Sequence, residues 1–156
     1  MKPFRIVMLA GMTALAATVA SGVAWSQDAM KTVQDRQALM KRQSEDLKPV
    51  KAFIDGKGEL VAAQTGGADL ETAIKAIPAA FPKDTGMAQF PGKSGAKPVV
   101  WTDWDKFSAA AQTATAKAQA LNTALKGGDK GAIQAAFEDM GKNGCGGCHT
   151  TFREKI

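Results

Sequence analysis

Side chains that bind metals or act as nucleophiles are scarce in this 156-residue chain, which has one histidine, His149, and two cysteines, Cys145 and Cys148. A structural zinc site uses four cysteine or histidine ligands, so zinc would here need an added carboxylate or a partner chain. The chain also lacks a clustered basic patch, because its lysines are scattered as on a solvated surface. We therefore expect no nucleic-acid partner.

Internal repeats, low-complexity tracts and a second domain are absent as well, and the apolar residues follow a helical period almost throughout. The first helix is predicted over about residues 29–54 and ends at the glycines of 56–58. A second helix is marked by Leu70, Ile74 and Ile77 and ends at the following prolines. Its start stays open, because residues 60–64 also look helical before Gly66 and Gly67 interrupt the pattern.

Three prolines and three glycines between residues 82 and 98 predict a long crossover loop. Apolar residues at steps of three and four then predict a third helix from Trp101 to Leu125, closed by Gly127 and Gly128. The last helix begins near Asp129, a residue suited to capping. Four amphipathic helices with one long crossover predict an all-α fold, an antiparallel four-helix bundle.

The first 26 residues have the composition of a secretory signal peptide. Lys2 and Arg5 precede an uncharged run over residues 6–25, and small residues flank a cleavage point before Gln27. The alternative is a retained membrane anchor, although the run is only weakly apolar. Cleavage would leave residues 27–156 as one domain with no membrane contact and a net charge of +3, because two of the 20 basic and none of the 15 acidic residues are lost.

Near the C-terminus the chain reads Cys-Gly-Gly-Cys-His over residues 145–149, the C-x-x-C-H attachment signature of a c-type haem. The two thiols are spaced to bond the two vinyl groups of one haem, and the next residue places an imidazole under the iron. A thioredoxin-like pair would follow a strand, which is not predicted here, and a plain disulfide would leave the histidine unexplained. The motif therefore predicts one covalent haem c, attached outside the cytoplasm, in the periplasm of a bacterial source.

Only seven residues follow His149, whereas ordinary small cytochromes c carry this motif near the N-terminus. A C-terminal motif on the fourth helix of a bundle resembles the class II cytochromes c, the cytochrome c′ family. The resemblance covers the whole mature chain and is most specific at the haem motif followed by Phe152 and Arg153. It extends to the segments 36–40, 77–82 and 98–101.

This resemblance implies roles for individual residues. Cys145 and Cys148 would be the thioether anchors, His149 the proximal iron ligand, and Arg36 the family's arginine near the haem edge. Met40 falls where the family places its distal residue. In one branch that residue is a methionine bound to iron, in low-spin electron carriers; in the other it is unbound, and a five-coordinate iron binds nitric oxide or carbon monoxide.

Helical spacing agrees with these roles, since Arg36 and Met40 are four residues apart and share a helix face. A solvent-exposed arginine and a core methionine are the alternatives. Met40 is the mature methionine expected on a rigid element opposite His149, so we predict a His149/Met40-ligated electron carrier, with gas binding as the alternative. Phe152 and Arg153 are expected beside the haem, on its proximal side.

Catalysis is not expected, because no second histidine or acid–base group lies near the motif to serve as a peroxidase catalyst. The aromatic residues Trp101, Trp104 and Phe137 are expected in the haem crevice or the core. The predicted partners are redox proteins, with a diatomic gas or a second copy of the chain as further candidates.

Overall fold

The computed structural model describes residues 20–156, and their side chains from residue 27 onward. The predicted signal segment thus lies mostly outside the described residues. Within them the helices are α1 (Ala20–Ile54), α2 (Leu60–Lys75), the 3-10 turn η1 (Pro78–Ala80), α3 (Val99–Thr102), α4 (Trp104–Gly127), α5 (Lys130–Asp139), the π-helical segment η2 (Met140–Gly146) and α6 (Gly147–Phe152).

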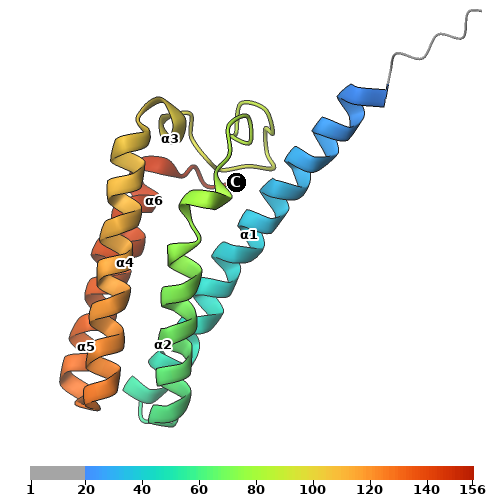
Figure 1. Cartoon of the computed structure of the whole chain (residues 1–156). Coiled ribbons are helices and arrows are strands. Elements are labelled where there is room, and N and C mark those ends of the chain that lie inside the picture. The colour runs from blue at the N-terminus through green and yellow to red at the C-terminus, as the bar shows by residue number, and fades with distance from the viewer. Residues whose placement is uncertain (1–19) are drawn as a thin grey trace, which may run out of the picture.

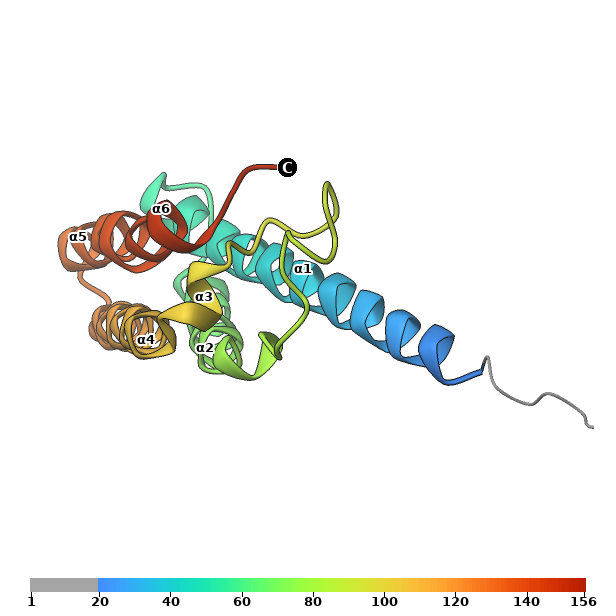
Figure 2. The same cartoon turned by 90° about the horizontal axis from the view of Figure 1, so that it is seen from above.

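These helices form the predicted antiparallel four-helix bundle, in which α5, η2 and α6 run on as the fourth helix (Figure 1). Seen from above, α1 crosses the bundle and its N-terminal half extends beyond the other helices (Figure 2). Among residues 20–156, no helix combines the length and the apolar character needed to cross a bilayer.

Helix α2 is continuous through Gly66 and Gly67, where the sequence suggested an interruption. Both glycines are buried because they are contact points between helices. A Cβ atom on Gly66 would collide with the backbone of Asp46 and with Pro49 Cγ of α1, and one on Gly67 would lie 2.5 Å from Asn122 Oδ1 of α4. The glycine pair therefore permits close helix packing instead of ending the helix.

The third predicted helix is divided in two by Asp103, which has φ −134° and ψ 62°. Its side chain accepts a hydrogen bond from the backbone N–H of Lys106, 3.3 Å away, and so caps the start of α4. Asp129 caps α5 in the same way, with Ala132 N at 2.7 Å, as its sequence position predicted. Gly128, at φ 74°, ends α4 in the left-handed conformation.

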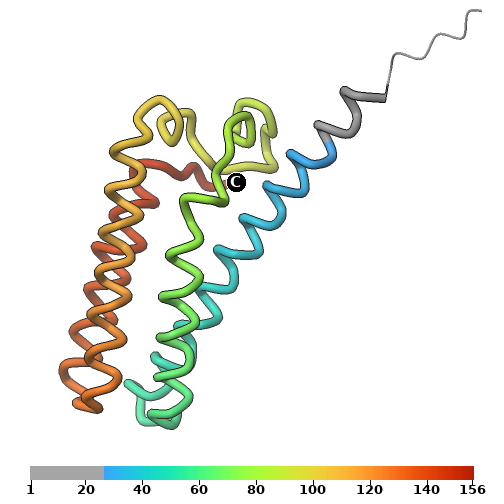
Figure 3. The backbone as a smooth tube through the Cα atoms, in the orientation of Figure 1, coloured from blue at the N-terminus to red at the C-terminus, as the bar shows by residue number. Residues whose placement is uncertain are grey.

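The crossover loop and the C-terminal tail lie together at one end of the bundle (Figure 3). An antiparallel bridge joins Ala96 to Arg153, and Glu154 N donates to Gly95 O at 2.8 Å. Lys97 N donates to Phe152 O at 3.0 Å. These bonds tie the end of α6 to the loop that precedes α3.

The apolar core runs along the bundle between α1, α2, α4 and the fourth helix. Its largest fully buried side chains include Phe107, Leu121, Ile133 and Met140. Trp101 packs against this core and donates from Nε1 to Phe81 O at 3.0 Å. Trp104 differs from its predicted placement, because it is 39% exposed on the first turn of α4.

Candidate functional site

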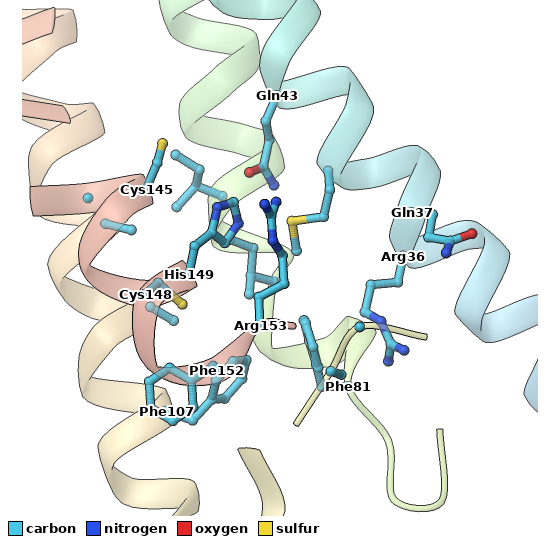
Figure 4. Close-up of a pocket in the computed structure, with 18 of the residues that line it drawn as sticks. Arg36, Gln37, Gln43, Phe81, Phe107, Cys145, Cys148, His149, Phe152 and Arg153 are labelled. Atoms are coloured by element: carbon cyan, nitrogen blue, oxygen red, sulfur yellow. The ribbon is translucent and has the colours of Figure 1, made fainter. Parts of the chain in front are cut away.

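A cavity of about 420 Å³ lies between α1, α2, α4 and the fourth helix. Residues that are distant in sequence meet there. The cavity is lined by every candidate site residue that the sequence indicated: Arg36, Met40, Cys145, Cys148, His149, Phe152 and Arg153. The labelled members of this set surround one space in the close-up view (Figure 4).

The fourth helix supplies the two thiols and the imidazole. Cys145 lies in the π-helical segment η2, whereas Cys148 and His149 lie in α6, and all three line the same cavity. No disulfide joins the two cysteines in this structure. A π-helical turn widens the helix locally and is frequent at functional sites. Most of the glycine-rich stretch of the sequence thus lies in a widened helical segment, Met140–Gly146, beside the cavity.

Burial governs the ionisation of these three groups. It raises the pKa of both thiols, and the neighbouring Cys145 raises that of Cys148 further. It also lowers the pKa of His149, an effect to which the positive Arg153 adds. The cavity therefore favours neutral thiols and a neutral imidazole, whose free nitrogen lone pair can coordinate a metal.

Arg36 closes one side of the cavity as a buried charge, with 5% of its surface exposed. Its Nη2 donates to Thr85 O at 2.7 Å and to Ser94 Oγ at 2.9 Å, and its Nη1 donates to Thr85 Oγ1 at 2.9 Å. Its Cζ lies 4.6 Å from the centre of the Phe81 ring. The guanidinium thus holds the crossover loop in place, and burial lowers its pKa.

Aromatic rings line the floor of the cavity below His149. The Phe107 ring is at the centre of this cluster, with its centroid 4.8 Å from that of Phe81 and 5.3 Å from that of Phe152 (Figure 4). Ile74 and Ile77 of the α2 side add to the apolar wall. Sequence reasoning identified Phe152 but missed Phe81 and Phe107 as cavity residues, since an apolar periodicity does not distinguish core from pocket.

Gln43 was missed as well, although it lies three residues after Met40 and therefore on the same helix face. Its amide Nε2 is 3.5 Å from Ala73 O, and the side chain lines the cavity. The i, i+3 spacing from Met40 was the sequence signal that could have identified it.

The cavity suits a large, flat, mostly apolar group with a covalent link to cysteine. Two thiols and an imidazole meet on one wall, and apolar side chains form most of the remaining lining. A buried cation lies at the edge without an acidic partner among the residues described. Within residues 20–156, no three histidine, cysteine or acidic side chains are placed to hold a metal ion together. These features fit haem c.

Three comparisons with known proteins point to the same family. A family profile named "Cytochrome C′" matches residues 31–153. Cytochrome c′ of Pararhodospirillum photometricum is 36% identical over 124 residues, which cover 78% of this chain and 95% of that protein. The crystal structure of cytochrome c′ from Rubrivivax gelatinosus is 31% identical, with a TM-score of 0.69, and covers 81% of this chain and 97% of its own.

A nitric oxide complex of a mutant cytochrome c prime from Alcaligenes xylosoxidans has a TM-score of 0.71 and covers 81% of this chain and 97% of its own. Its identity of 23% shows the shared fold.

The comparisons contradict the predicted low-spin electron carrier with Met40 as sixth iron ligand. The relatives that are 30% or more identical to this chain are cytochromes c′, in which the iron is typically five-coordinate. The prediction was wrong because excluding the other methionines showed only which methionine lies on the distal wall. It gave no evidence that the Met40 sulfur is bonded to iron. Met40 is half-buried and packs against the apolar core, which accounts for a methionine at this position.

Proposed function

This chain belongs to the cytochrome c′ family, and from that premise we propose that it is an exported protein that binds a diatomic gas. The cofactor of the family is covalent haem c. Proteins of the family bind gases such as nitric oxide, and some of them are dimers. When bound, the haem supplies an iron with one open coordination position.

The observation that carries the proposal is the single cavity shared by both thiols, the imidazole and an apolar wall. Cys145 and Cys148 would hold the haem through thioether bonds, and His149 would be the proximal iron ligand. The lowered pKa of His149 supports this role, because only the neutral imidazole can coordinate.

The residues around the ring would orient it and control access. Phe152 would contact its face, while Arg36 and Arg153 would lie near its polar edge. Met40 would form part of the apolar distal wall without a bond to iron. Such a wall excludes water and leaves room for a small, uncharged ligand.

The test is an absorption spectrum of the exported, haem-loaded protein in the ferrous state, with and without carbon monoxide. We expect a high-spin spectrum that changes on addition of the gas, and a Met40→Leu variant that behaves in the same way. A low-spin ferrous spectrum that carbon monoxide leaves unchanged would refute the proposal.

Mass spectrometry of the same sample tests the proposed cleavage before Gln27, and recovery of the protein from the periplasm tests the proposed location.

Two further parts of the proposal concern partners and activity. The chain is proposed to act without catalysis, because His149 is its one histidine and would already be bound to iron. A second copy of the chain is the proposed protein partner, and sedimentation of the holoprotein over a range of concentrations measures that association.

A further inference from the structure

Gln43 introduces a polar group into the distal wall of the cavity. It lies on α1 one turn beyond Met40, is half-buried, and lines the same space as His149. In the close-up its side chain extends from the α1 ribbon toward the imidazole, which comes from the opposite helix α6 (Figure 4). The amide therefore lies on the wall of the cavity opposite His149.

The hydrogen-bonding capacity of this amide is only partly used. A glutamine NH₂ group has two N–H donors, and among the described residues it has one hydrogen bond, to Ala73 O. The N–O distance of 3.5 Å is longer than the 2.7–3.2 Å of an ordinary hydrogen bond. At least one N–H can thus turn toward a ligand at small cost.

The other polar side chains on the α1 wall are already engaged. Arg36 donates to the crossover loop through both Nη atoms. Gln37 also lines the cavity, but it is exposed and its Nε2 donates to Lys93 O at 2.6 Å. Gln43 is therefore the side chain of this wall that combines an underused donor with a position inside the cavity.

We propose that the Gln43 amide donates a hydrogen bond to the gas that enters the cavity, and so selects nitric oxide over carbon monoxide. This inference rests on the proposed gas-binding function and adds a specificity-determining residue to it. The outer atom of nitric oxide on ferrous haem carries more negative charge than that of carbon monoxide, so a donor stabilises it more. Donors on the distal side are one of the features by which a protein tunes haem ligands.

The experiment uses ferrous holoprotein with carbon monoxide or nitric oxide as the probe. The C–O stretching frequency is measured by infrared spectroscopy, and both affinities are measured by titration. The variants are Gln43→Leu and, as a second substitution of similar volume, Gln43→Met. The matched control is Gln37→Leu. It removes an amide that lies on the same helix and lines the same cavity, but whose N–H donor is already bonded to Lys93 O.

We expect both Gln43 variants to raise the C–O stretching frequency, because a donor near the oxygen lowers it. The ratio of nitric oxide affinity to carbon monoxide affinity should fall by up to about five-fold, the full effect of one ordinary hydrogen bond. The control should keep the frequency and the ratio of the unsubstituted protein. Equal frequencies and equal ratios in all four proteins, with the gases bound, would overturn this inference alone. Failure of the unsubstituted protein to bind either gas would overturn the proposed function and this inference with it.

Discussion

At the scale of single residues, Arg36 is a buried cation whose recorded hydrogen-bond acceptors are all neutral: Thr85, Ser94 and the carbonyl of Ala80. Substitution by glutamine removes the planar fork that reaches all of them, and a lysine cannot replace it. We expect Arg36→Gln to lower the free energy of unfolding by about 3 kcal/mol, since hydrogen bonds to charged groups contribute more than neutral ones. Urea unfolding of the holoprotein measures the change.

The control for this prediction is Lys31→Gln. The Lys31 side chain is 69% exposed and pairs with Asp35, which is 63% exposed, so its loss should change stability by less than about 0.5 kcal/mol. Equal effects of the two substitutions would show that Arg36 does not anchor the crossover loop.

Asp46 is a second residue with unusual surroundings, because its Oδ2 is buried without a hydrogen-bond partner among the described residues. Burial raises its pKa above 3.8; Arg42 opposes this effect, and Asp69 and Glu45 reinforce it. A raised pKa means that the folded state binds more protons than the unfolded state. Stability is therefore lost as the pH rises from about the unfolded pKa through the folded one.

Asp46→Asn removes this charge, so we expect the free energy of unfolding at pH 7 to rise by about 1 kcal/mol. The loss of stability above about pH 4 should become smaller in the variant. Urea unfolding over a pH series measures both effects. Asp35→Asn, at a carboxylate that is 63% exposed, is the control. A variant less stable than the parent at pH 7 would contradict the prediction.

The residue scale also shows what the sequence could predict. The spacing of Arg36 and Met40 predicted a shared helix face, and both residues line one cavity with the haem motif. The partners of Arg36 could not be predicted, because Thr85 and Ser94 lie 49 and 58 residues away in a loop without periodicity. A local pattern identifies the face of a helix, while the groups opposite that face depend on the tertiary fold.

At the scale of elements, glycine has two structural roles that the sequence pattern did not distinguish. Gly127 and Gly128 end a helix as predicted, whereas Gly66 and Gly67 lie inside one. Glycine lowers helix propensity in either case, and only packing against α1 and α4 reveals why it is present at residues 66 and 67. Division of the third helix at Asp103 was missed for a related reason, since Trp101, Trp104 and Phe107 keep a helical spacing across the break.

The close approach of α1 and α2 leads to a prediction for Gly66→Ala. Alanine favours a helix by about 1 kcal/mol over glycine, but its Cβ would lie 2.6 Å from Pro49 Cγ and would collide with the backbone of Asp46. We expect a net loss of roughly 2 kcal/mol in the free energy of unfolding. Gly127→Ala is the matched control, because no atom lies within 4 Å of its added Cβ, and it should be neutral or stabilising. Thermal unfolding compares them, and a more stable Gly66→Ala protein would contradict the packing argument.

At the scale of the whole molecule, the fold class followed from the helical period, and one motif at the C-terminus indicated where to look for the site. The function did not follow from them, because a five-coordinate and a six-coordinate iron can use the same helices and the same methionine. The two states differ in the distance between the methionine sulfur and the iron, which no sequence pattern predicts. The relatives therefore overturned the predicted methionine ligation while they supported the fold.

The cavity itself gives the last prediction, which concerns the bundle without haem. Residues 140–152 contain the π-helical turn and four glycines, and they line the cavity that the haem would fill. Without that group the apolar wall would face water, and the last helix would lose the apolar contacts that the haem would make along its cavity face. We expect a Cys145→Ala/Cys148→Ala variant to melt roughly 10 °C or more below the holoprotein, since 1 kcal/mol shifts the Tm by about 4 °C in a domain of this size.

Amide hydrogen exchange locates this loss of stability. Residues 140–152 should exchange faster in the variant than in the holoprotein, while the part of α4 around Leu121 and Leu125, which is fully buried away from the cavity, should stay protected. A single Cys148→Ala variant, which keeps one thioether bond, should have a melting temperature between those of the double variant and the holoprotein. If the double variant melts with the holoprotein and its last helix stays equally protected, the bundle does not depend on the haem, and the cavity is held open by the protein alone.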